Sequence, residues 1–532
     1  MRGSRSKAFI ALLSGLALVA AACGGGGSGE DADESSIDSA VANEVKNQLY
    51  ATTAVGLTST TAVRTPTTME EWLKLWETER AAVVKKIKDG KFGLSADGKT
   101  LTGPGDFKID LSKCPAGWNN MEGISDTEIK IGHTTAQSGT LADYGNIARG
   151  MDVLWAYQNN NGGFKDSTGK TRKLTMVTKD DGYDSARTIP LVDELLDSVK
   201  VAAVWTLGSP NTMKVYDKLN QRCVPQPFSM TGHPAWGDPI NHPWTTGLAL
   251  AYTSEAILWG SFIDQHIDEL TKKDGKVTVS ALVMNNDFGK AYDIGFKNYL
   301  SQSKHKAKID YFPEFIEPSA PTITDAMTTL AAKNPEIFVA MTAGTSCTQS
   351  YIEAAQNGLK GSALYLFTGQ PCKGSSFAGK DKAGTTSDGW WIAGGGNRDF
   401  NAASEDNNAF FKWGREELKK AGHDYKASGS FGLGFNYSWP FWQSLQIAAA
   451  LDGGLNRTNI ILAIRSIDMT NPNLLEGIRF NMNGAKDSYP IEGSEFGKWD
   501  FAKQTWVQQG AIVEMSGKSA NCAWDQSAAL CK

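Results

Sequence analysis

The stretch EIKIGHTTAQSGTLADYGNIARG, residues 128–150, decides the fold that the sequence predicts. Ile129 and Ile131 alternate as in a strand that faces a core, and Ser138 and Gly139 supply a tight turn. A helix follows, because apolar residues recur on one helical face until NNGG ends it. In open parallel sheets, the loop after such a strand is where small molecules bind. The stretch therefore predicts an α/β architecture.

The alternation of strands and helices continues after this stretch. Apolar and β-branched runs predict strands, and apolar residues at helical spacing predict the helices between them. The predicted strands are 174–178, 201–205, 228–231, 277–284, 309–312, 337–341, 364–367, 478–483 and 495–504, and the predicted helices are 185–198, 212–221, 254–270, 288–301, 322–333, 347–357, 405–421, 441–451 and 459–466. Strands that alternate with helices form parallel sheets, and two successive runs predict two similar lobes.

Length and charge narrow the range of functions. A chain of 532 residues should form more than one compact unit, because single cores rarely grow past ~300 residues. The formal net charge of −5, without a basic stripe in the sequence, argues against nucleic-acid binding, which needs clustered Lys and Arg. The spacing of His and Cys fits no zinc site, so we expect no metal and no cofactor.

The amino terminus is similar to a bacterial lipoprotein signal. A positively charged start precedes an apolar run over residues 8–22, which ends in VAAAC at Cys23. We expect residues 1–22 to be removed and a lipid on Cys23 to anchor the exported protein to the outer face of the cytoplasmic membrane. An ordinary cleaved signal is the alternative. The Gly-rich and acidic residues 23–38 would then form a flexible tether.

Six further cysteines point to disulfides, since an even set in an exported protein usually pairs. They allow many pairings, and the sequence does not choose among them. We favour Cys522 with Cys531, Cys347 with Cys372, and the remaining Cys114 with Cys223. Free buried thiols are the alternative.

Residues 39–125 form an amino-terminal extension that is partly helical. Residues 67–89 predict a helix, with Thr68 and Glu71 at capping-box spacing. Its expected apolar face carries Trp72, Trp76, Val83 and Ile87. We prefer to interpret the extension as a strap packed on the main body; a module that contacts a partner is the alternative.

Motifs of enzymes are scarce in the sequence. GLSADGKT, residues 93–100, fits a phosphate-binding loop pattern, but that loop requires a strand before it and a helix after it. Here LTGPG follows, and Asp97 with Gly98 predicts a hairpin turn instead. The sequence contains neither G-x-S-x-G nor H-E-x-x-H. We therefore expect no enzyme activity, with a hydrolase as the alternative.

Segments spread over residues 127–514 carry a family likeness. In order they are IKIG, SGTLADYGNIARG, TMVTKDDGYDSAR, VAAVWTLGSPNT, FSMTGHP, ALVMNNDFGKAYDIGFKNYL, PEIFVAMTAGTS, YIEAAQNGLKG, YLFTGQP, NYSWPFWQSLQIAAAL and GIRFNMNGAKDSY. Together they resemble the type I periplasmic binding proteins, in the leucine/isoleucine/valine-binding branch of the ABC-importer receptors.

The resemblance implies two Rossmann-like lobes, each a parallel sheet flanked by helices, joined by a three-strand hinge and closing around a ligand. Lobe 1 would comprise residues 126–247 and 394–476, lobe 2 residues 248–393 and 477–515, and residues 516–532 a tail. The crossovers are expected near residues 246–249, 391–394 and 477–480.

The resemblance also implies a ligand site between the lobes. The matching positions are Tyr144, Ser209, Thr231, Gly232 and His233 in lobe 1 and Phe288, Thr342 and Gln370 in lobe 2. Ser209 matches a serine that holds the ligand's head group, although it also fits a plain helix cap. His233 departs from the family pattern and would narrow the cleft, contact an anion or cap its loop. Core packing is the alternative for Phe288, and Met230 replaces a neighbour if the register shifts by one.

Gln370 is the most informative departure from the family. Amino-acid binders commonly place a carboxylate at this position for the ligand's ammonium group. A neutral amide cannot form that charge-assisted hydrogen bond, which is roughly twice as strong as a neutral one. The expected ligand is thus an amino acid, an amide or a related small polar or amphipathic molecule.

These observations predict the extracytoplasmic solute-binding receptor of an ABC importer. It would be monomeric, would bind a small-molecule ligand without chemistry, and would deliver it to an ABC permease in the membrane. The alternative is a sensor domain that signals through a separate partner protein.

Overall fold

The structure is a computed structural model that describes residues 65–513 and 519–531. The expected signal peptide, Cys23 and the tether lie outside the described residues. Within the described part of the chain, no helix is both long enough and apolar enough to cross a bilayer.

The opening stretch folds as its pattern predicts. β4 (Glu128–Thr135) buries Ile129 and Ile131, and α3 (Gly145–Asn160) follows after a short 3-10 turn. β4 lies in the middle of a four-stranded sheet of order β5-β6-β4-β7 and pairs in parallel with both neighbours. This arrangement places the loops after β4 and β7 at the same sheet edge.

The elements around this sheet complete the first α/β run. Its other strands are β5 (Phe164–Lys165), β6 (Thr171–Asp180) and β7 (Ala203–Thr206), and its helices are α4 (Ser185–Glu194), α5 (Ser209–Met213) and α6 (Tyr216–Gln221). A parallel pair, β8 (Gln226–Ser229) and β9 (Thr245–Gly247), lies beside β7 through a bridge between Leu207 and Met230.

The second run builds a seven-stranded sheet of order β11-β10-β12-β13-β14-β17-β18. The first five strands are parallel, β17 pairs antiparallel with β14, and β18 pairs antiparallel with β17. The strands are β10 (Val277–Met284), β11 (Ile309–Ile316), β12 (Ile337–Met341), β13 (Tyr365–Thr368), β14 (Trp391–Ala393), β17 (Ser494–Asp500) and β18 (Thr505–Val513). The predicted bounds of β10 and β12 are confirmed to the residue.

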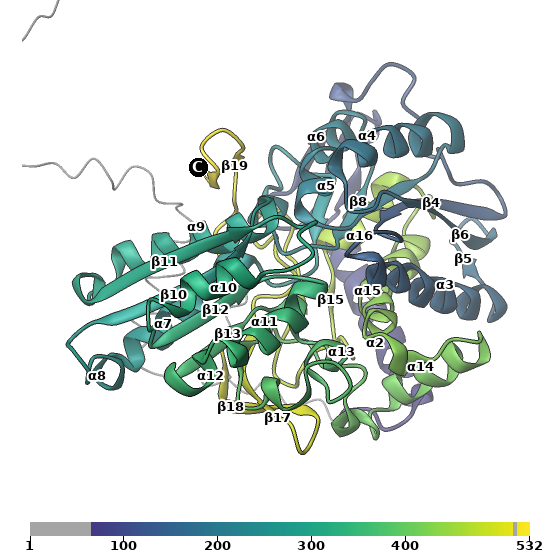
Figure 1. The fold of residues 1–532 in the computed structure, drawn as a ribbon. Coiled ribbons are helices and arrows are strands. Elements are labelled where there is room, and N and C mark those ends of the chain that lie inside the picture. Colours follow the sequence, from purple (N-terminus) through teal and green to yellow (C-terminus); the bar gives the residue numbers. More distant parts are fainter. Residues whose placement is uncertain (1–64, 514–518, 532) are drawn as a thin grey trace, which may run out of the picture. The chain divides into compact units, whose positions relative to one another are not determined.

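Helices cover both faces of this sheet. The helices of this run are α7 (Tyr252–Gln265), α8 (Ile267–Leu270), α9 (Asp287–Gln302), α10 (Thr324–Ala331), α11 (Thr345–Gln356), α12 (Leu359–Ser362) and α13 (Ser375–Ala378). Figure 1 shows α10, α11 and α12 in front of the strands. Side chains of β10 alternate between two cores: Val279 and Val283 share one with Ile257 of α7, and Leu282 shares the other with Leu330 of α10. Burial on both faces explains why these strands are almost entirely apolar.

The carboxyl helices α14 (Ala409–Lys420), α15 (Ser430–Ala450) and α16 (Arg457–Arg465) return to the first sheet. α15 packs along α3, where Gly150 and Gly434 face each other (Figure 1). A Cβ on Gly434 would lie 2.5 Å from the carbonyl oxygen of Ile147 and 2.7 Å from the Cα of Gly150. Only glycine therefore allows the two helices to approach this closely.

The amino-terminal extension packs on these helices. α2 (Met69–Asp89) starts at the Thr68 cap, which accepts a hydrogen bond from the Glu71 N–H. The predicted apolar face is confirmed as buried, and Trp76 lies edge-on against Trp439 and Trp442 of α15. This is the packing that a strap requires.

The segment with the phosphate-loop pattern is a hairpin, as predicted. β1 (Gly93–Leu94) pairs antiparallel with β2 (Thr100–Thr102), and β3 (Lys108–Asp110) adds a third strand. Gly98 adopts a φ of 69°, which the turn requires and which glycine tolerates.

The three preferred disulfides are present in the structure: Cys114–Cys223, Cys347–Cys372 and Cys522–Cys531. The last closes a small hairpin of β19 (Trp524–Asp525) and β20 (Leu530–Cys531). Cys114–Cys223 joins the extension to the loop before β8.

Several predicted boundaries near the carboxyl end are wrong. α15 begins at Ser430 rather than at residue 441, because Pro440 lies inside the helix instead of starting it. The strand predicted over 478–483 shortens to β16 (Phe480–Asn481), which pairs with the unpredicted β15 (Asp468–Met469). The strand predicted over 495–504 ends at Asp500, and β18 follows after a turn. The chain therefore enters the second sheet at Ser494, later than the crossing predicted near 477–480.

Candidate functional site

A cavity of about 140 Å³ is lined by residues that directly follow strands of both sheets. Leu207 and Met230 directly follow β7 and β8, and Ala343 and Gln370 follow β12 and β13 after one residue. The carboxyl ends of parallel strands are where open α/β sheets bind small molecules. The volume corresponds to roughly ten water-sized groups.

Three segments that run between the two sheets also line the cavity. Leu248 and Ala249 come after β9, Gly394 comes after β14, and Ile491 precedes β17. A change in the angle between the sheets would therefore change the shape of the cavity directly.

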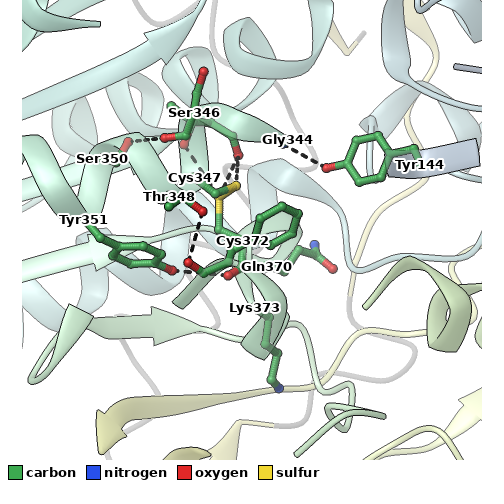
Figure 2. The surroundings of a disulfide bond; sticks show 12 residues. Tyr144, Gly344, Ser346, Cys347, Thr348, Ser350, Tyr351, Gln370, Cys372 and Lys373 are labelled. Atoms are coloured by element: carbon green, nitrogen blue, oxygen red, sulfur yellow. Dashed lines mark hydrogen bonds between the residues drawn. A yellow bond between two sulfur atoms is a disulfide. The ribbon is translucent and has the colours of Figure 1, made fainter. Parts of the chain in front are cut away.

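Four tyrosines, Tyr144, Tyr183, Tyr252 and Tyr437, line the cavity. Burial raises the pKa of each phenol, that of Tyr252 to about 12, so all four hydroxyls are neutral at pH 7. The Tyr144 oxygen accepts a hydrogen bond of 3.1 Å from the Gly344 N–H (Figure 2). This bond connects the loop after β4, in the first sheet, with the loop after β12, in the second. The Tyr437 hydroxyl has no hydrogen-bond partner among the described residues.

The apolar part of the wall on the side of the second sheet includes Phe288, at the start of α9. Its ring lies edge-on against Tyr252, with ring centroids 5.1 Å apart. Asn286 caps the helix by accepting from the Phe288 N–H at 3.1 Å, which fixes the position of the ring relative to β10.

Gln370 lies against a buried carboxylate that the sequence analysis missed. Glu255 accepts from the Gln370 backbone N–H at 2.8 Å, from its side-chain amide at 3.1 Å, and from the Tyr292 hydroxyl at 2.6 Å. Burial raises the pKa of Glu255 to about 8, although these hydrogen bonds favour the charged form. Glu255 itself is fully buried and is not among the residues that line the cavity.

Of the charged side chains on the cavity wall, Lys373 and Arg398 form ion pairs within the protein, and Asp399 accepts hydrogen bonds from two backbone N–H groups. Lys373 forms a buried ion pair with Glu495 and donates to the Asn397 carbonyl. Arg398 pairs with both carboxylate oxygens of Glu405 at 3.1 and 3.2 Å. In Figure 2, the side chains of Gln370 and Lys373 point away from the Cys347–Cys372 disulfide that holds their loop.

Five of the eight predicted site residues lie outside the cavity lining. Ser209 and Thr231 are buried and share a hydrogen bond of 2.6 Å with each other. Gly232 packs so tightly that a Cβ would lie 2.4 Å from the Leu250 carbonyl oxygen. Thr342 is buried, and its neighbour Ala343 lines the cavity instead.

The fifth residue, His233, is covered by the carboxyl-terminal hairpin. Its ring is buried, accepts from the Ala235 N–H at 3.2 Å, and lies edge-on against Trp524. Burial lowers its pKa to about 3, so the ring is neutral at pH 7 and a poor partner for an anion. The structure thus brings together Tyr144, Phe288 and Gln370, and their role in ligand binding stays a prediction.

Signals for the missed residues were present but weak. Glu255 is the single charged residue early in an otherwise apolar helix, a position where a buried charge needs a specific partner. Tyr183 follows a glycine in the turn DDGYD, and Tyr437 lies within the apolar helix α15. Nothing in the local pattern distinguishes these tyrosines from core residues.

Comparisons with solved structures identify the same architecture. A fatty acid ABC transporter substrate-binding protein from Thermomonospora curvata is 18% identical, with a TM-score of 0.61, over 76% of this chain and 97% of that one. A branched chain amino acid ABC transporter protein from Thermus thermophilus with bound valine is 15% identical, with a TM-score of 0.61, over 74% and 98%. A solute binding protein from R. palustris in complex with benzoate is 17% identical, with a TM-score of 0.58, over 74% and 99%.

No curated protein sequence matches the chain. The sequence profile of a family described as periplasmic binding protein matches residues 128–409, which is more than half of the chain and spans the strand ends on both sides of the cavity. As its sequence motifs and its fold both indicate, the chain belongs to the periplasmic binding protein family.

Proposed function

We propose that this protein is the extracytoplasmic solute-binding receptor of an ABC importer. It holds a small polar or amphipathic solute in the cavity between the two sheets, and the segments around Leu248, Gly394 and Ile491 act as the hinge. The observation that carries the proposal is the cavity itself, because both sheets and all three of these segments contribute to its wall. Hinge closure around a ligand is a known transition of two-lobed binding proteins.

The absence of chemistry is part of the proposal. The cavity wall presents phenols, three amides, two serine hydroxyls, two ion-paired cations and one hydrogen-bonded carboxylate, but no nucleophile paired with a base among the residues that line it. In this proposal the protein is a monomer that is anchored by a lipid on Cys23 and delivers its solute to a separate permease. A binding site without catalytic groups is sufficient for that role.

A thermal-shift screen tests the function. The soluble protein from residue 24 onward is mixed with amino acids, amides, alcohols, sugars and aromatic acids. A solute that binds only the folded state raises the melting temperature by mass action. Stabilisation by a few related solutes supports a receptor, whereas a folded protein that responds to none of them argues for another role.

The anchor has its own test. Labelled palmitate fed to cells that make the full chain should appear in the wild-type protein and not in the Cys23→Ser variant. Equal labelling of both proteins would place the lipid elsewhere.

A further inference from the structure

We propose that the solute is uncharged, with an apolar or aromatic body and hydroxyl or amide groups, and that Tyr183 and Gln370 set this preference. The inference rests on the proposed receptor function and names the chemical class of its solute.

The first support is the state of the charged side chains on the wall. The three ammonium hydrogens of Lys373 are taken by the Glu495 carboxylate and by the carbonyls of Asn397 and Gly394. Arg398 is held by Glu405 and by the Leu474 carbonyl at 2.8 Å. Both cations on the wall already have an anionic partner, so a solute carboxylate would find no unpaired counter-charge there.

A solute cation meets the same difficulty. Asp399 accepts from the backbone N–H groups of Ser375 and Asn401 at 2.9 and 3.0 Å, and burial raises its pKa. Glu255 and Glu495 lie behind Gln370 and Lys373 rather than on the wall. A charge that leaves water without a partner is strongly disfavoured, so the site discriminates against both signs.

Tyr183 closes the polar end of the first sheet. Its ring packs on Gly208, where an added Cβ would lie only 2.3 Å from a ring carbon. The hydroxyls of the adjacent Ser209 and of Thr231 bind each other, and neither residue lines the cavity. The strand end that the sequence analysis expected to receive a head group is therefore covered by a phenol.

The backbone of Tyr183 shows that this position is specified. Its φ of 63° lies in the left-handed region, which costs free energy for a residue with a bulky side chain. The buried Asp181 carboxylate accepts from the Tyr183 N–H at 2.9 Å and is itself held by Asn211 at 2.8 Å and Thr188 at 3.0 Å. Asp181 thus acts as a positioning residue for the covering phenol.

Gln370 supplies a neutral acceptor at the other end. Its amide nitrogen donates to the Leu250 carbonyl at 2.9 Å and to Glu255 at 3.1 Å, so both amide hydrogens are used. The amide oxygen is left without a partner in the described part of the chain. Together with the unpartnered Tyr437 hydroxyl, it selects a solute that donates and accepts neutral hydrogen bonds.

Matched pairs of probes test the class of the solute. Benzamide and benzyl alcohol are compared with benzoate, and isovaleramide with valine, by calorimetric titration of the wild-type protein at pH 7. We expect the neutral member of each pair to bind at least tenfold more tightly. Tighter binding of the charged members overturns the inference and leaves the receptor function standing. Silence from these probes and from the whole solute panel contradicts both.

Tyr183→Ala tests the covering phenol, with Tyr157→Ala as the matched control, because Tyr157 packs against Trp413 and Trp442 and does not line the cavity. The first variant should lose most of the tenfold discrimination, because it uncovers the Ser209–Thr231 pair, and the control should retain it. Unchanged discrimination in a folded Tyr183→Ala protein removes Tyr183 from the proposal. If that variant fails to fold, the titrations of the matched probes into the wild-type protein still decide the class of the solute.

Discussion

The indole ring of Trp524 lies edge-on against the imidazole of His233, with ring centroids 4.4 Å apart. Trp524 also packs against a small core of Met213, Tyr216, Ala235 and Trp236 beside the loop after β8. The carboxyl-terminal hairpin therefore covers the His233 ring. A ligand cannot contact the imidazole from the side that the hairpin occupies.

Replacing Trp524 by alanine should destabilise the protein without weakening solute binding. The lost packing is expected to cost about 1–3 kcal/mol, because it leaves a gap beside a buried cluster. Differential scanning calorimetry measures the stability and titration measures the affinity. Gln526→Ala on the same hairpin, which removes only hydrogen bonds of 3.3 and 3.4 Å, is the matched control. A loss of affinity in Trp524→Ala alone would show that the hairpin shapes the cavity.

Glu255 predicts a specific dependence of stability on pH. Its folded pKa of about 8 lies above the unfolded value of 4.5, so the native state retains a proton that the unfolded state releases. Stability from this group is therefore present below pH 4.5 and is lost as the pH rises towards 8. Glu255→Gln should flatten the fall in melting temperature between pH 5 and 8, while Glu416→Gln on the exposed face of α14 should not. Parallel curves for all three proteins would contradict the assignment.

His242 predicts a loss of stability at alkaline pH. Burial disfavours its charged form, but hydrogen bonds to Asp217 at 2.7 Å and Asp238 at 3.1 Å outweigh it and raise its pKa to about 9. The stability it contributes is complete below pH 6.5 and is lost as the pH rises through 9. His242→Gln should remove this alkaline loss, which urea titrations at pH 7 and pH 10 would measure. A wild-type protein as stable at pH 10 as at pH 7 would exclude it.

The Cys347–Cys372 disulfide ties the first turn of α11, which follows the loop after β12, to the loop after β13, and both loops contribute to the cavity wall (Figure 2). Its removal by paired serine substitutions should cost about 2–4 kcal/mol and should also weaken solute binding. Removal of Cys522–Cys531 is the control, because that bond lies away from the cavity lining. Equal solute affinity in the two double variants would show that the Cys347–Cys372 disulfide does not contribute to solute binding.

The sequence was most informative where one local pattern determines the structure. β10 and β12 were predicted to the residue because an apolar run buried on both faces has few alternatives. The buried face of α2 was predicted for a similar reason, since its tryptophans recur at helical spacing. β18 was missed because its exposed residues alternate weakly, and it becomes a strand by pairing with β17.

The site was predictable only in outline, because its chemistry depends on contacts between distant residues. The family resemblance pointed to Tyr144, Phe288 and Gln370, which line the cavity, but gave no sign of the pairing of Ser209 with Thr231. Gln370 and Glu255 are 115 residues apart in the chain, and no local pattern links them. Which polar groups remain free for a solute is thus a property of the tertiary structure.

The most direct test of the account is a calorimetric titration of the strongest solute from the screen into three variants. Tyr144→Ala and Phe288→Ala each remove an aromatic ring that lines the cavity, from opposite sides. Phe312→Ala removes an exposed ring of β11 and is the control. A solute held between the two sheets should bind both wall variants at least tenfold more weakly and the control unchanged. Full affinity in either folded wall variant would contradict binding in this cavity.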